Sequence, residues 1–138
     1  MLKLKVGSTQ EGFVAPNAVS LAQALFSKEA WYRAIYVDDV PAGFVMVYDE
    51  TLREEPPAEP RAGLWRFMVD ECYQGRGIGR AALDQVIAHV RAKGCFSAFE
   101  TSYVPGPGCP EPFYLKAGFH HTGRMDGTEV VLELPLAP

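Results

Sequence analysis

Alternating glycines followed directly by an amphipathic run constrain this chain more than any other feature. They lie in residues 74–83 (QGRGIGRAAL), and apolar side chains then recur at helical spacing as far as Val90. Glycines let an anion approach backbone N–H groups, and the first turn of a helix offers such groups without internal partners. The segment therefore predicts an anion-binding loop at the start of a helix that ends near Gly94.

The segments on either side of this loop predict a strand–helix–strand unit. Residues 64–70 (LWRFMVD) are apolar on both faces apart from Arg66, which is typical of a central strand covered on two sides. Residues 95–103 (CFSAFETSY) predict the strand that follows the helix.

The remaining elements are predicted from apolar periodicity and turn residues. Proline-rich residues 50–63 predict an irregular, solvated loop rather than a linker between domains. The other predicted elements are a helix over 20–30, strands at 34–37 and 43–49 joined by a turn at 38–41, a short helix over 111–118, and a strand pair over 119–125 and 129–134. We therefore expect one domain over residues 1–138, of the α/β (α+β) class, with a mixed, mostly antiparallel sheet flanked by helices.

Composition excludes several classes of protein. The net charge is −4 and no basic block is present, which argues against a nucleic-acid partner and mildly favours a cationic small substrate. No apolar run approaches the roughly 20 residues of a membrane helix, and the N-terminus lacks the apolar core of a signal peptide, so we expect a cytoplasmic protein without a membrane partner. The three cysteines and three histidines show no ligand-like spacing, and no metal is expected.

Three kinds of phosphate site compete for the glycine loop. A nucleoside-triphosphate loop needs a lysine followed by a serine or threonine, which this segment lacks. The dinucleotide pattern G-x-G-x-x-A does occur at residues 77–82, with Glu100 about 20 residues beyond it. Residues 70–76 separate the strand from these glycines, however, and only 38 residues follow Glu100, too few for the further units of that fold.

The residues at the start of the loop favour a third cofactor. Residues 74–79 (QGRGIG) have the form Q/R-x-x-G-x-G/A and closely resemble the acetyl-CoA pyrophosphate loop of the GNAT superfamily of N-acetyltransferases. Residues 113–119 (FYLKAGF) are similar to the late F/L-Y-x-K-x-G-F segment of the same superfamily. More narrowly, the chain resembles the bacterial spermine/spermidine acetyltransferases at residues 13–17 (FVAPN), 64–70, 73–79, 102–108 (SYVPGPG) and 121–127 (HTGRMDG).

This resemblance implies a cofactor site and a catalytic site. Backbone N–H groups and two arginines of the loop would hold the pyrophosphate, and a central-strand N–H, where the superfamily has a bulge, would hold the thioester carbonyl. The late tyrosine would protonate the departing thiolate. The base is inferred from position instead: Asp70 and Glu100 are expected at the ends of neighbouring strands, as the acids nearest the cofactor site. The cofactor residues are Met68, Val69, Gln74, Gly75, Arg76, Gly77, Ile78, Gly79 and Arg80, and the catalytic residues are Tyr114 as acid and Asp70 or Glu100 as base.

The acceptor implied by the narrower resemblance is a polyamine such as spermine or spermidine. Carboxylates and aromatic faces suit a long cation, and the candidates are Glu11, Phe13, Trp31, Tyr36, Glu54, Trp65 and Tyr103. Acetylation of another small amine, such as an amino acid or aminoglycoside, and a non-catalytic acyl-CoA-binding module stay open as alternatives. Because the superfamily often forms dimers, a homodimer is among the expected oligomeric states.

The chain departs from the superfamily pattern at three places. The superfamily begins with a strand and a helix, whereas here only residues 2–6 could be the tail of that helix, so the first strand is expected to be missing or shortened. Pro107 and Gly108 occupy the region of an asparagine often found before the tyrosine helix, and residues 64–66 replace an acid frequent on the central strand. The missing strand and the missing acid give weight to the binding-module alternative.

Overall fold

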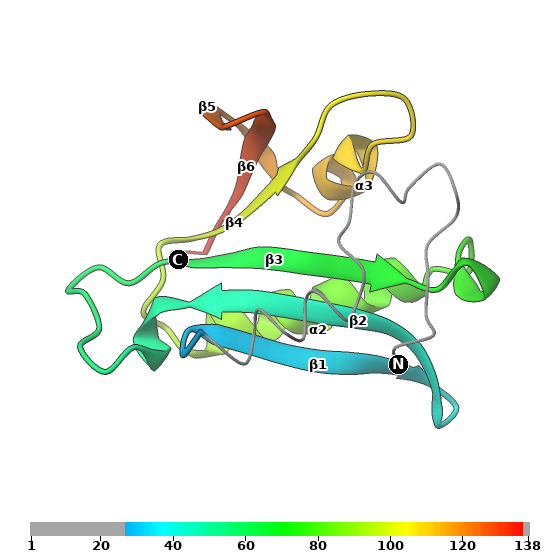
Figure 1. Cartoon of the computed structure of the whole chain (residues 1–138), viewed down its shortest axis with the longest axis horizontal. Helices are drawn as coiled ribbons and strands as arrows, with labels where there is room; N and C mark the ends of the chain where they lie inside the picture. The colour runs from blue at the N-terminus through cyan, green and yellow to red at the C-terminus, as the bar shows by residue number, and fades with distance from the viewer. Residues whose placement is uncertain (1–26, 137–138) are drawn as a thin grey trace.

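A computed structural model describes residues 27–136 of the chain and contains one six-stranded sheet (Figure 1). The strand order is β1-β2-β3-β4-β6-β5, and β3 and β4 are parallel while all other neighbours are antiparallel. The strands are β1 (Ala30–Val37), β2 (Val40–Asp49), β3 (Ala62–Val69), β4 (Ala98–Tyr103), β5 (His120–Asp126) and β6 (Glu129–Pro135). The helices are α2 (Ile78–Ala92) and α3 (Glu111–Lys116), with single 3-10 turns η1 (Glu50–Leu52) and η2 (Glu71–Tyr73). The predicted mixed, mostly antiparallel sheet is therefore confirmed.

The hairpin of β1 and β2 turns at two aspartates. Asp38 and Asp39 have φ values of 49° and 68°, the left-handed backbone that a tight hairpin turn requires and that aspartate tolerates better than most residues. The strands are longer than predicted, because Val40 and Pro41 already belong to β2. The helix predicted over residues 20–30 is wrong at its end, where Ala30 begins β1, and residues 20–26 lie outside the described part.

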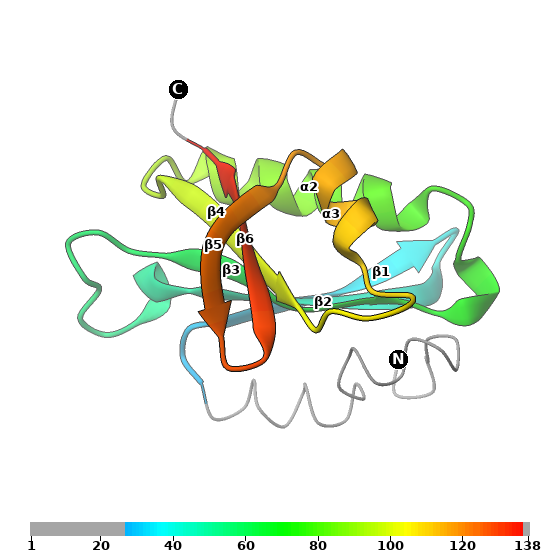
Figure 2. The same ribbon diagram turned by 90° about the horizontal axis from the view of Figure 1, so that it is seen from above.

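Helix α2 connects β3 to β4 and covers one face of the sheet (Figure 2). It buries the apolar stripe predicted from its periodicity, and Gly94 ends it with a φ of 69°. The stripe consists of Leu83, Val86, Ile87 and Val90. The predicted strand–helix–strand unit is therefore confirmed.

A β-bulge in β3 moves its side chains from one face of the sheet to the other. Met46 pairs with Arg66 but Val47 pairs with Leu64, so Trp65 is the extra residue. In an unbroken strand Leu64 and Met68 would share a face. Here Leu64 packs in the core under α2, whereas Met68 packs on the opposite face. Side chains of β3 are thus buried on both of its faces, as its apolar sequence predicts.

Strands β3 and β4 are joined only where they begin. Their register pairs are Ala62 with Phe99 and Gly63 with Glu100, and the two strands diverge beyond them. Figure 1 shows β4, β6 and β5 turning away from β3. Residues 64–69 consequently have a strand neighbour on the β2 side alone among the described residues, and their other backbone edge faces the opening.

Candidate active site

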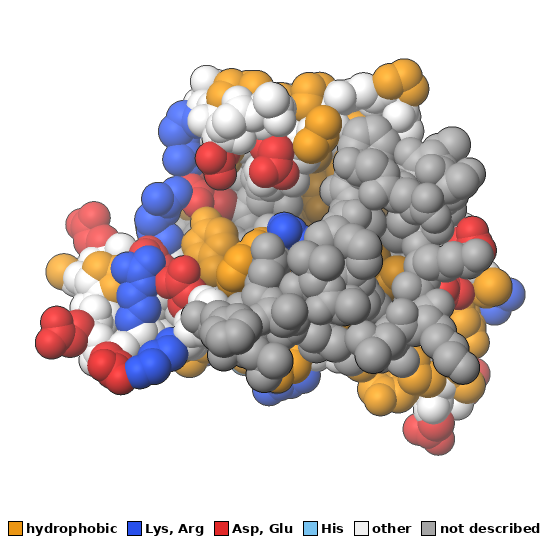
Figure 3. All heavy atoms as spheres, viewed as in Figure 1, with side chains coloured by type: hydrophobic (Ala, Val, Ile, Leu, Met, Phe, Trp, Pro, Cys, Tyr) orange, Lys and Arg blue, Asp and Glu red, His pale blue; other side chains and the backbone are white. Residues whose placement is uncertain are grey.

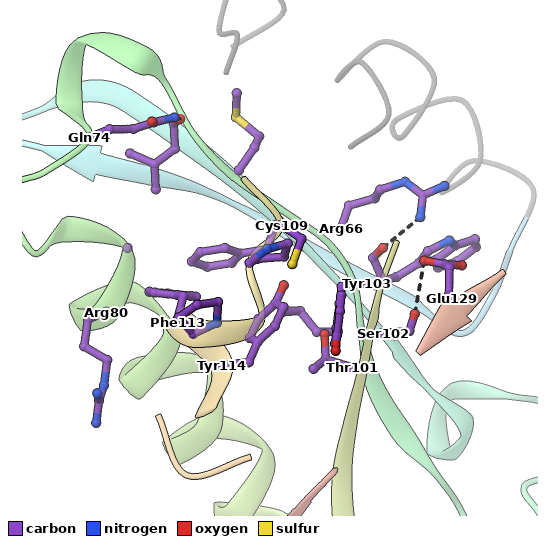
Figure 4. Close-up of a pocket in the computed structure, with 18 of the residues that line it drawn as sticks. Arg66, Gln74, Arg80, Thr101, Ser102, Tyr103, Cys109, Phe113, Tyr114 and Glu129 are labelled. Carbon is purple, nitrogen blue, oxygen red and sulfur yellow. Dashed lines mark hydrogen bonds between the residues drawn. The ribbon is translucent and has the colours of Figure 1, made fainter. Parts of the chain in front are cut away.

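A cavity of about 900 Å³ occupies the opening between β3 and β4. Most of its walls come from five places: residues 64–69 of β3, the glycine loop, residues 101–103 of β4, residues 108–114 around α3, and the β5–β6 hairpin. Glu29 and Tyr48 also line it. Figure 4 shows side chains from these segments converging on one space. The sheet opening thus connects the predicted anion-binding loop with the predicted catalytic tyrosine.

The backbone of the glycine loop suits an anion. Gly75 and Gly77 have φ values of 78° and 76°, and a Cβ added at either position would meet no atom within 4 Å. The Ala81 N–H donates to the Gly77 carbonyl at 3.1 Å and closes the first turn of α2. The N–H groups of residues 78–80 therefore have no acceptor within the helix and carry the positive end of its dipole.

Side chains around the loop hold it against its neighbours. Gln74 Nε2 donates to the Val69 carbonyl at 2.8 Å, which folds the loop back onto β3. Arg76 lies over the Tyr73 ring, with its guanidinium carbon 5.5 Å from the ring centroid. Arg80 departs from the prediction: its guanidinium donates to Asp84 at 3.0 Å and to the Lys116 carbonyl at 2.9 Å, and Figure 4 shows it pointing away from the other labelled residues.

Most of the predicted cofactor residues border the cavity. Seven of the nine line it: Met68, Val69, Gln74, Gly75, Gly77, Gly79 and Arg80. Arg76 and Ile78 are not among its lining residues. The bulge expected near Met68 and Val69 is at Trp65 instead, so that part of the prediction is wrong.

Tyr114 lies inside the protein at the cavity wall, with 7% of its surface exposed. Its ring packs at 5.5 Å from Phe113 and 5.6 Å from Phe119, measured between centroids. Burial raises the pKa of the Tyr114 hydroxyl, although a hydrogen bond with Thr101 acts in the opposite direction. The phenol consequently keeps its proton at neutral pH.

Neither acid predicted as the base lines the main cavity. Asp70 accepts a hydrogen bond from the Cys72 N–H at 3.3 Å and caps η2.

Glu100 lies in the first half of β4, beside Gly63, so the expectation that it lies at the end of its strand is wrong. Burial alone would raise the pKa of Glu100, but hydrogen bonds from Arg61, Tyr48 and Arg124 outweigh burial and lower this pKa to about 2.

Three other carboxylates line the cavity, and sequence reasoning missed all of them. They are Glu29, Asp126 and Glu129. Glu129 accepts a hydrogen bond from Ser102 Oγ at 3.3 Å (Figure 4), and its charge contributes to raising the pKa of Tyr114. Asp126 and Glu129 flank the β5–β6 turn, which no local motif connects with the glycine loop.

The predicted acceptor residues are dispersed. Trp65 and Tyr103 line the cavity, and the Tyr103 hydroxyl donates to Glu111. Trp31 instead stacks on His89 of α2 with 4.4 Å between ring centroids. Tyr36 is 61% exposed on β1, and Glu54 pairs with Lys28 away from the cavity. Glu11 and Phe13 lie outside the described residues.

Residues 27–136 lack two kinds of feature. No group of three histidine, cysteine, aspartate or glutamate side chains in this part could hold a metal ion. No helix in it is long and apolar enough to cross a membrane.

A splayed sheet that opens beside a glycine loop is typical of small domains that bind a phosphorylated cofactor in the opening. Residues 9–119 match the acetyltransferase (GNAT) family, and the chain therefore belongs to this family, which uses acetyl-CoA.

Relatives and solved structures agree with this assignment. The chain is 29% identical over 102 residues to the L-2,4-diaminobutyric acid acetyltransferase of Streptomyces avermitilis, a match that covers 73% of this chain and 53% of that protein. It is 28% identical over 134 residues to the spermine/spermidine N(1)-acetyltransferase of Bacillus subtilis, covering 91% and 83%. The fold is similar to that of the PaiA N-acetyltransferase of Thermoplasma acidophilum in complex with coenzyme A, with a TM-score of 0.64, 18% identity and coverage of 87% and 69%. The chain thus spans about half the length of the diaminobutyric acid acetyltransferase.

Proposed function

We propose that this chain transfers an acetyl group from acetyl-CoA to a primary amine, and that the acceptor is a polyamine such as spermidine. The observation that carries the proposal is the continuous cavity that leads from the glycine loop to Tyr114 and on to the acidic β5–β6 hairpin. Acetyl-CoA supplies an acetyl group on a thioester, and the residues of the cavity bind, orient and move protons around it.

The glycine loop is proposed to hold the pyrophosphate. The space next to Gly75 and Gly77 is open, so no protein atom competes with a phosphate there. The N–H groups of residues 78–80 would donate to the phosphate oxygens. The backbone edge of β3 that faces the opening would then donate to the thioester arm of the cofactor, and the N–H of Val69 is the candidate, because the neighbouring Asp70 N–H donates to β2.

Tyr114 is proposed as the general acid. Its buried phenol stays protonated at neutral pH, because burial raises its pKa. The ordinary pKa of a thiol is near 8.5 and that of tyrosine near 10. Apolar surroundings that disfavour the phenolate also disfavour a departing thiolate, so the thiolate can accept the proton of Tyr114 Oη.

Glu129 is proposed as the group that accepts a proton from the amine, directly or through water. It lines the same cavity as Tyr114, whereas Asp70 and Glu100 do not. Asp126 borders the cavity beside it and would attract the remaining ammonium groups of a polyamine. The two curated relatives are named for acceptors that carry more than one amino group, which supports a cationic acceptor.

An amine panel tests the proposal. Release of coenzyme A is followed with spermine, spermidine, 2,4-diaminobutyrate and a simple monoamine, and acetyl-CoA binding is measured by calorimetry. We expect the highest kcat/KM with a polyamine. Turnover of other amines alone would refute the polyamine acceptor, and acetyl-CoA binding without turnover of any amine would indicate a binding module.

A further inference from the structure

The carboxylate of Glu100 joins both halves of the sheet at the point where β3 and β4 separate. Glu100 Oε2 accepts from the Tyr48 hydroxyl of β2 at 2.7 Å and from Arg61 Nη2 at 2.6 Å. Glu100 Oε1 accepts from Arg61 Nη2 at 2.7 Å and from Arg124 Nη2 of β5 at 2.9 Å. Groups from both sides of the opening therefore meet on a residue that forms the last register pair between the two strands.

The path from Tyr48 to Glu100 depends on a glycine. Tyr48 and Glu100 both pair with Gly63, on opposite sides of β3, so the Tyr48 side chain must cross β3 to reach Glu100. A Cβ added to Gly63 would lie 2.4 Å from two carbon atoms of the Tyr48 ring and 2.5 Å from its hydroxyl. Gly63 does not have a positive φ, so its backbone conformation does not require glycine. Glycine is required because the Tyr48 ring occupies the space where a side chain would lie.

The elements that meet at this junction distinguish it from the ion pairs nearby. Figure 3 shows basic and acidic side chains intermingled over the segment that joins β2 to β3, at the left of the view. In that segment Arg53 pairs with Glu29 and Glu50 and is 46% exposed. The side chain of Glu100 is 14% exposed, as is that of Glu50, so exposure does not set it apart. What sets Glu100 apart is that it accepts hydrogen bonds from β2, from the residue that precedes β3 and from β5 on one carboxylate.

We propose that Glu100 is a positioning residue that sets the opening between β3 and β4, and with it the fit of the cavity to the thioester arm of the cofactor. The inference rests on the proposed function, because it assigns that arm to the opening and the pyrophosphate to the glycine loop. Tyr48, Arg61, Arg124 and Gly63 act through Glu100. None of these five residues is assigned contact with the reacting atoms.

The test compares two ligands in the full-length chain. One is acetyl-CoA, and the other is the 3′-phosphoadenosine diphosphate portion of coenzyme A, which carries the pyrophosphate but lacks the thioester arm. The variants are Glu100→Gln, Tyr48→Phe and Gly63→Ala, and Arg53→Gln is the matched control. Calorimetry gives the two dissociation constants, and steady-state kinetics with one fixed amine gives kcat and KM.

We expect the three junction variants to weaken acetyl-CoA binding by about tenfold, which corresponds to loss of one charge-assisted hydrogen bond. Binding of the fragment and all constants of Arg53→Gln should stay within about twofold of wild type. In a Tyr48→Ala background, Gly63→Ala should have no further effect, because the ring with which its methyl group would collide is gone.

Two results would overturn the inference. One is a parallel change of both dissociation constants, which would indicate general loss of structure. The other is unchanged acetyl-CoA binding in the folded junction variants. Failure of the wild-type chain to bind either ligand would instead overturn the proposed cofactor site, and the inference with it. Tyr48→Phe removes a single oxygen, so it keeps the test informative even where Glu100→Gln folds poorly.

Discussion

Acid should destabilise this protein partly through one carboxylate, and Glu100→Gln isolates that contribution. The pKa of Glu100 falls from the ordinary value of 4.5 to about 2 in the folded chain. The folded state therefore keeps Glu100 ionised in a range where the unfolded chain binds a proton. Its stabilising contribution is fully present above pH 4.5 and is lost as the pH falls towards 2.

The size of this contribution follows from the two pKa values. The difference corresponds to about 3 kcal/mol of unfolding free energy at neutral pH. The Glu100 side chain is 14% exposed, but its partners Arg61 and Arg124 are 58% and 51% exposed, so water competes for their hydrogen bonds and the figure is an upper bound. Asp49, whose pKa is also lowered because hydrogen bonds from Lys93 and Thr51 outweigh its burial, titrates equally in both proteins and cancels in the comparison.

Urea unfolding followed by circular dichroism, at several pH values between 7 and 3, measures the effect. Glu100→Gln should be less stable than wild type by between about 1 and 3 kcal/mol at pH 7, and this gap should narrow steadily below pH 4.5. Glu54→Gln makes the same chemical change at a side chain that is 78% exposed and should show almost no gap. A gap for Glu100→Gln that stays constant from pH 7 to 3 would refute the reasoning.

Three further variants test the site and the core. Gly77→Asp should weaken acetyl-CoA binding at least tenfold in calorimetry, because a carboxylate faces the pyrophosphate; Gly94→Asp has similar backbone strain outside the cavity and should bind normally. Tyr114→Phe should lower kcat at least tenfold and leave the acetyl-CoA dissociation constant within about twofold, so an unchanged kcat would remove its role as acid. Leu83→Ala deletes a side chain with 0% exposure and should cost about 3 kcal/mol in urea unfolding, and a cost below about 1 kcal/mol would contradict its place in the core.

Local patterns predicted the part of the fold that carries the cofactor loop. The period of apolar residues in α2, the stop at Gly94 and the paired aspartates at 38–39 are each determined within a few residues of sequence. The strand–helix–strand order then places the loop at the end of β3 by the usual right-handed connection. For these reasons most of the predicted loop residues line the cavity.

Features that depend on sheet order or register escaped prediction. Glu129 reaches the cavity because β6 lies between β4 and β5, an order that no local pattern specifies. Glu100 lies far from Asp70 because the parallel register pairs it with Gly63 at the start of β3. Trp31 is an aromatic residue of the kind that can bind a cation, but its position on β1 places its ring against His89 of α2.

Because β3 and β4 pair at only two positions, hydrogen–deuterium exchange of the β3 backbone can show whether a ligand occupies the opening between them. Beyond Gly63 the register of β3 with β4 ends, so the backbone N–H groups on that edge lack the ladder of hydrogen bonds that β2 provides on the other edge. Such groups exchange with solvent deuterium much faster than those bonded to β2. A bound molecule that accepted their hydrogen bonds would slow this exchange residue by residue, and the pattern of slowed amides would show how deeply a ligand enters the sheet.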